Sequence, residues 1–158
     1  MDQFVVSNIG IFSQIAEDAF ADMEQAEGKA RTPRLGGVGD IVKFDPQRKS
    51  FKAALVYITF SAMWLEARLH VEIAERFSKS KAREFDKKKY ECRLKFLGVL
   101  DESLLSRVHQ FRLLRNDLVH EKAHCNQNTV HVAQKEARKA RALMQDISRR
   151  LADQSVIT

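Results

Sequence analysis

An arginine, an asparagine and a histidine stand close together late in the sequence, in the segment RNDLVH at residues 115–120. On a helical wheel, Arg115 falls in the middle of an apolar stripe. That stripe consists of Leu104, Val108, Phe111, Leu114 and Leu118. A guanidinium keeps its charge, so burying it without a partner costs several kcal/mol and some anion must meet it. The candidates are a buried carboxylate, a helix end or a bound phosphate, whose oxygens match the arginine fork well.

His120 follows Arg115 by five residues and adds a group that can give or take a proton near neutral pH. Cleavage of a phosphodiester by a neighbouring 2′-hydroxyl requires such a proton transfer. Asn116, between the two, can donate or accept hydrogen bonds. A cation, an imidazole and an amide are the parts of a metal-independent ribonuclease. The alternative is a structural Arg115 paired with an internal acid such as Glu66, with an incidental histidine at the helix end.

The five-residue spacing sets a geometric condition on this hypothesis. On a continuous helix, residues five apart are separated by about 140°, so Arg115 and His120 would not share a face. Either the helix ends or distorts between them, or a second chain completes the site. Glu66, at the edge of the central helix stripe, is the candidate acid for pairing with Arg115 or His120, although a plain surface acid is the alternative.

The most basic stretch is residues 76–95, which holds nine lysines and arginines against three acids. The whole chain carries a formal charge of +6, which favours an anionic partner, with nucleic acid first. We therefore predict that Lys87, Lys88, Lys89 and Arg93 contact an RNA backbone. A solvated surface helix without a ligand is the alternative.

Apolar residues recur at helical spacing along most of the chain, and no credible strand pattern is found. The predicted helices cover residues 5–28, 51–77, 76–95, 102–118 and 129–151, with Asp101 as an N-cap. Residues 28–50 hold both prolines and four of the six glycines, which predicts a surface loop; the glycines match no phosphate-binding motif. The 158 residues thus predict a single domain, an all-α antiparallel bundle of about five helices.

Several classes of protein do not fit the composition. The most apolar stretch, residues 53–65, is 13 residues long, whereas a bilayer span needs about 20, so no membrane association is expected. Two cysteines make no disulfide framework, and no export signal precedes the first helix, which favours the cytoplasm. We predict no metal and no cofactor. The cluster of His120, His124, Cys125 and His131 lacks the paired spacing of a zinc site.

The segment RNDLVH resembles the Arg-x4-6-His motif of HEPN domains, which are small helical bundles common in prokaryotic toxins and defence systems. The polar Asn116 directly after the arginine fits that motif. The acid Glu66 in an earlier apolar helix and the closing helix fit the wider pattern, so that the resemblance covers about residues 50–150.

The resemblance implies an endoribonuclease that works as a homodimer, with two motifs facing each other in one composite cleft. Arg115 would hold the scissile phosphate, His120 would serve as general base or acid, and Asn116 would orient a neighbour. The setting would be a toxin or antiviral-defence effector, with an antitoxin or defence protein as partner. In one branch a tyrosine follows the motif histidine by two residues; here Lys122 stands there, so control by AMP attachment is not expected. The alternatives are a non-catalytic HEPN module that binds RNA, nucleotide or protein, and a purely structural helical dimer.

Overall fold

The computed structural model describes residues 3–33, 36–37, 40–42, 47–119 and 133–155. In these ranges the chain forms six helices and one pair of short strands, so the predicted all-α bundle is confirmed. The helices are α1 (Gln3–Ala30), α2 (Lys49–Arg76), α3 (Lys79–Phe85), α4 (Tyr90–Phe96), α5 (Glu102–Val119) and α6 (Ala133–Ser155).

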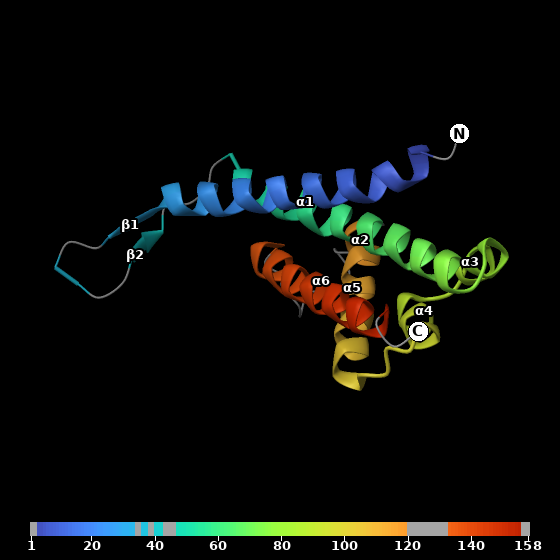
Figure 1. Cartoon of the computed structure of the whole chain (residues 1–158). Helices are drawn as coiled ribbons and strands as arrows, with labels where there is room; N and C mark the ends of the chain where they lie inside the picture. The colour runs from blue at the N-terminus through green and yellow to red at the C-terminus, as the bar shows by residue number, and fades with distance from the viewer. Residues whose placement is uncertain (1–2, 34–35, 38–39, 43–46, 120–132, 156–158) are drawn as a thin grey trace.

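The two longest helices, α1 and α2, lie antiparallel and side by side along most of their length (Figure 1). Their contact is built from small and aromatic residues. Ala16, Ala19, Phe20 and Met23 of α1 and Ala54, Tyr57, Ile58 and Ala62 of α2 are all buried. The alanines let the helices approach closely. The rings of Phe20 and Tyr57 meet edge to face at 5.2 Å, a favoured geometry for aromatic pairs.

Between α1 and α2 the chain forms a hairpin that we did not predict, and it projects from the end of the bundle (Figure 1). Strand β1 (Arg31–Pro33) pairs antiparallel with β2 (Asp40–Val42). The expectation of no strand is therefore wrong at this place. Strands of three residues are too short for an alternating pattern to be seen in the sequence. Gly36, between the strands, has φ of +79°, a conformation that glycine adopts at no steric cost.

Helix α6 packs its apolar stripe against the bundle as predicted. Ala133, Ala137, Ala140, Met144, Ile147 and Leu151 are all buried. Helix α5 runs crosswise to α1 and α2 (Figure 1). The predicted N-cap of α5 is confirmed, since Asp101 Oδ1 accepts a hydrogen bond from the Leu104 N–H at 3.0 Å. Arg150 Nη2 of α6 lies 2.8 Å from Asp101 Oδ2, so the same carboxylate joins the two helices.

The basic stretch forms two short helices, α3 and α4, rather than the single helix that we predicted. Ser78 Oγ caps α3 by accepting a hydrogen bond from the Lys81 N–H at 3.1 Å. The four residues 86–89, DKKK, separate α3 from α4, and a run of like charges opposes a continuous helix there. This break positions the side chains of the candidate site.

Candidate functional site

Arg115 lies in the last turns of α5, half-buried, as its place in the apolar stripe predicted. Its Nη1 donates a hydrogen bond to Oδ1 of the neighbouring Asn116 at 3.4 Å. In the described ranges, no carboxylate forms an ion pair with this guanidinium. An amide oxygen carries no net charge, so this contact orients the guanidinium without neutralising it. Within the part of the chain that the structure describes, Arg115 therefore has no anionic partner and a single acceptor, the Asn116 amide oxygen.

Glu66 on α2 is not the partner of Arg115. Its Oε2 accepts a hydrogen bond from the Tyr90 hydroxyl at 3.4 Å, and its Oε1 lies 3.5 Å from Arg93 Nη2. Of the two partners considered for Glu66, Arg115 forms no ion pair with it in the described ranges, and His120 lies outside them; the cation that Glu66 meets is Arg93. Half of the Glu66 side chain remains exposed, at 49%. The carboxylate is thus held at the surface of the site and is open to a ligand.

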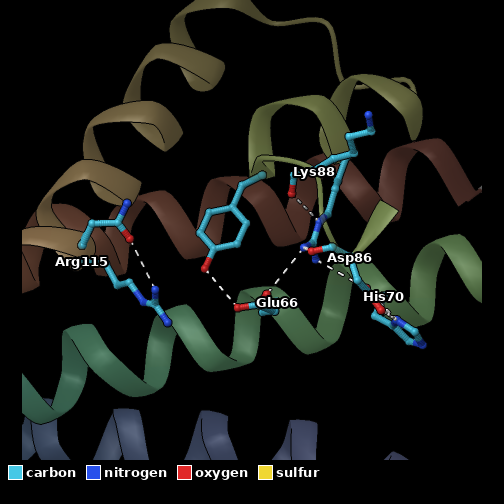
Figure 2. A network of polar contacts seen from close by, with 8 residues as sticks. Glu66, His70, Asp86, Lys88 and Arg115 are labelled. Carbon is cyan, nitrogen blue, oxygen red and sulfur yellow. Dashed lines mark hydrogen bonds and ion pairs between the residues drawn. The ribbon is translucent and has the colours of Figure 1, made fainter. Parts of the chain in front are cut away.

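Tyr90 connects the two arginines with Glu66. Burial raises the pKa of its hydroxyl, and the charge of Glu66 raises it further, whereas Arg115 and Arg93 oppose the rise. The charges of Glu66, Arg115 and Arg93 therefore all act on the Tyr90 hydroxyl. Figure 2 shows Arg115 on one side of Glu66 and the labelled Lys88 and Asp86 on the other. The predicted residues Arg115 and Asn116 of α5 and Glu66 of α2 thus lie in one region, around Tyr90.

Arg93 does not belong to the exposed basic face, and this part of the RNA-binding prediction is wrong. Its side chain is only 2% exposed. Nε donates to the Lys88 carbonyl at 3.0 Å, and Nη2 donates to the Asp86 carbonyl. These carbonyls lie where the chain breaks between α3 and α4, so Arg93 supplies the donors that a continuous helix would have provided. The Arg93 guanidinium therefore stabilises the fold and is not exposed to an RNA ligand.

A histidine that sequence reasoning missed extends the same network. His70 Nδ1 lies 2.9 Å from Asp86 Oδ1 and 3.0 Å from Oδ2 (Figure 2). The carboxylate fixes the ring through Nδ1, which leaves Nε2 for another partner. His70 follows Glu66 by four residues on α2, and that spacing alone places both side chains on one face of a helix. The spacing could have identified His70.

The lysines at the helix break differ from Arg93. Lys87, Lys88 and Lys89 are exposed, and none of them forms an ion pair within the described part of the chain. They remain free for the predicted contact with a polyanion. His120 and the cluster formed by His124, Cys125 and His131 lie outside the described residues.

The described arrangement can bind a phosphate and hold proton-carrying groups beside it. Arg115 offers charge and donors, Glu66 and His70 offer groups that exchange protons, and the lysine run adds positive charge.

In the described ranges, no helix has the length and apolar character needed to cross a bilayer. The comparisons found no matching family model, no matching curated protein and no matching solved structure.

Proposed function

We propose that this protein is a metal-independent endoribonuclease of the HEPN type. The observation that carries the proposal is Arg115, a half-buried guanidinium oriented by an amide and without a carboxylate partner in the described ranges. A cation in this state has charge and unused donors for a phosphate, whose oxygens accept two parallel hydrogen bonds from a guanidinium. The motif RNDLVH then assigns His120 to proton transfer.

In the proposed reaction, the ribose 2′-oxygen attacks the adjacent phosphorus while a general base removes the 2′ proton. The bond between phosphorus and the 5′-oxygen breaks, and that oxygen receives a proton from a general acid. The products are a 2′,3′-cyclic phosphate and a 5′-hydroxyl, so no water is consumed. Arg115 stabilises the charge that develops on the phosphate oxygens. His120 serves as base or acid, and Asn116 fixes the direction of the guanidinium.

We propose that two chains form the complete site, because Arg115 and His120 would lie on different faces of one continuous helix. Apolar side chains on α2 support a contact with a second copy. Phe51, Val56 and Met63 remain 38–39% exposed on this central helix. The protein would act in the cytoplasm as a toxin or antiviral-defence effector, held in check by an antitoxin or activated by a defence partner.

The test is incubation of purified protein with RNA in EDTA, comparing wild type with His120→Ala. Loss of the proton-transfer group should lower cleavage by roughly 10² to 10⁴-fold and leave RNA affinity nearly unchanged. His109→Ala is the matched control, because His109 is a partly exposed histidine on α5 that contacts Glu91 and not Arg115. Equal rates for wild type and His120→Ala would show that the catalytic assignment is wrong.

The exposed lysines favour a second candidate, an RNA-binding HEPN module without catalysis. In that case, replacing Lys87, Lys88 and Lys89 by glutamine should weaken RNA binding and flatten its salt dependence. The log–log slope should fall by about 0.7 for each phosphate of a single strand that the variant no longer neutralises. A wild-type affinity that does not respond to salt would exclude this candidate too.

A further inference from the structure

Three phenylalanines meet where α2, α3 and α4 join, and we call them the aromatic platform: Phe77, Phe85 and Phe96. The rings of Phe85 and Phe96 stack at 4.2 Å between centroids, and Phe77 meets Phe96 at 4.4 Å. Phe85 and Phe96 also pack against the core, whereas Phe77 is 54% exposed. Packing against the core therefore accounts for the positions of Phe85 and Phe96, but it does not account for the exposed ring of Phe77.

Three cationic side chains lie on α3, the helix that carries Phe85. Lys81 Nζ lies 5.5 Å from the Phe85 ring centroid and 5.9 Å from that of Phe96. Lys79 and Arg83 on α3 are exposed, and neither forms an ion pair within the described ranges. Glu84 is engaged by Lys81 at 2.8 Å. The free charge beside the rings is therefore positive, which complements an anionic ligand that also carries flat apolar surfaces.

The aromatic platform adjoins the candidate site. Phe85 directly precedes Asp86, whose carboxylate contacts His70 and lies 3.8 Å from Arg93 Nη1. Phe77, the residue directly after α2, follows Glu66 by eleven residues, which corresponds to a rise of about 16 Å and a rotation of about 20° around the helix axis. One extended single strand of RNA could therefore contact both Arg115 and the aromatic platform.

We propose that the aromatic platform binds an unpaired base of single-stranded RNA, with Phe77 as the stacking surface and Lys79 and Arg83 contacting the neighbouring phosphates. Aromatic rings beside a cationic groove are how proteins hold single strands, because every base has a face that stacks. The bases of a duplex already stack on one another, and its deep major groove does not admit these side chains. The inference rests on the proposed function only for the choice of RNA as ligand.

The test measures binding of a labelled single-stranded RNA of about 10 nucleotides to the full chain, in a His120→Ala background that prevents cleavage. Phe77→Ala should weaken binding about 5- to 150-fold, the equivalent of about 1–3 kcal/mol for one stacked base. Phe77→Leu should lose most of that affinity as well, because leucine restores apolar area without an aromatic face. Phe77→Trp should retain it.

Leu100→Ala is the matched control, since Leu100 is an apolar residue that is 69% exposed and stands between α4 and α5, outside the segments that carry the rings. It should bind RNA as the parent protein does, and circular dichroism should be unchanged in all variants. Parent-like binding by Phe77→Ala or Phe77→Leu would overturn the proposal. Equal affinity for the duplex form, or Phe77-dependent binding to anionic lipid vesicles with no preference for RNA, would overturn it too.

Failure of this proposal is distinguishable from failure of the proposed function. If the protein binds RNA in a Phe77-dependent way but never cleaves it, the aromatic platform is supported as an RNA-binding site and the proposed ribonuclease activity is wrong. If cleavage depends on His120 but not on Phe77, and Phe77→Ala leaves the RNA affinity unchanged, the ribonuclease activity is supported and the aromatic platform is not an RNA-binding site.

Discussion

Two arginines three residues apart on α5 differ in how their charge is used. Arg112 meets Glu91 of α4 through two hydrogen bonds, Nε to Oε2 and Nη2 to Oε1, each of 3.2 Å. Arg115 meets only the amide of Asn116 at 3.4 Å within the described ranges. A bidentate carboxylate neutralises a guanidinium and uses its donors, whereas an amide does neither. Arg112 therefore joins two helices, and Arg115 is left able to bind a ligand.

Arg93 is, like Arg112, an arginine whose donors are used within the protein. It is nearly fully buried; Nε and Nη2 donate to two backbone carbonyls and Nη2 also lies near Glu66, whereas Nη1 has no hydrogen-bond partner in the described ranges. Among these three arginines, the number of acceptors engaged within the described ranges separates the two structural residues from Arg115, for which we propose a functional role. Charge and sequence position do not.

The largest expected effect on stability is that of Arg93→Ala. Removing the guanidinium leaves the carbonyls of Asp86 and Lys88 without their donor and Glu66 without its pair. Each backbone carbonyl left without its donor costs about 1–3 kcal/mol, and Arg93 serves two of them, whereas the half-exposed Glu66 adds little. Urea unfolding should show this decrease in the free energy of unfolding. A decrease as small as that of an exposed ion pair such as Arg107 with Asp146 would contradict the structural role.

A smaller effect separates Arg112 from Arg115 directly. Arg112→Ala should lower the free energy of unfolding by about 1–3 kcal/mol, because Glu91 is only 15% exposed and loses its charged donor. Arg115→Ala should change it by less than about 0.5 kcal/mol, since no described carboxylate depends on Arg115. Thermal or urea unfolding of the two variants, side by side, measures the difference. Equal losses would mean that Arg115 is also a structural residue.

The smallest effect is a dependence on pH. Burial alone would raise the pKa of Glu91, but hydrogen bonds from Arg112, its own backbone and His109 outweigh it and hold the pKa below its usual value of 4.5. A carboxyl with a lowered folded-state pKa contributes stability above its unfolded pKa, and that contribution is lost as the pH falls through the folded pKa.

The pair of Glu91 and Arg112 should therefore stabilise the fold at pH 7 and lose that contribution in acid. The difference in unfolding free energy between wild type and Glu91→Gln should shrink as the pH falls below 4.5. Asp101 and Asp146 also have lowered pKa values, so the difference between the two proteins, rather than the wild-type curve, isolates Glu91. A difference that stays constant from pH 7 to strong acid would contradict the assignment.

The sequence predicted those features that lie within one helix. The apolar spacing of α6 marks the residues that are buried, and Asp101 followed by an apolar helix marks an N-cap. These features depend on residues within a turn or two of each other, which a sequence pattern records directly.

Features that depend on contacts between elements were missed. Arg93 looked like one more cation in a basic stretch, because its acceptors exist only once the chain breaks after Phe85. The pairing of Arg112 with Glu91 and of His70 with Asp86 joins residues 16 to 21 positions apart, and nothing in helical periodicity specifies such partners. The partial burial of Arg115 followed from the wheel, but helical spacing did not indicate that Arg93 is the arginine that meets Glu66.

The central claim, that Arg115 keeps its charge for the phosphate of RNA, is tested most directly by RNA cleavage in EDTA with wild type, Arg115→Ala and Arg107→Ala. The account predicts 2′,3′-cyclic phosphate ends from wild type and from Arg107→Ala, whose arginine already pairs with Asp146 at 2.6 Å. Arg115→Ala should cleave about 10²- to 10³-fold more slowly, with an unchanged free energy of unfolding. Equal cleavage by all three proteins, or no cyclic phosphate ends from wild type, would contradict it.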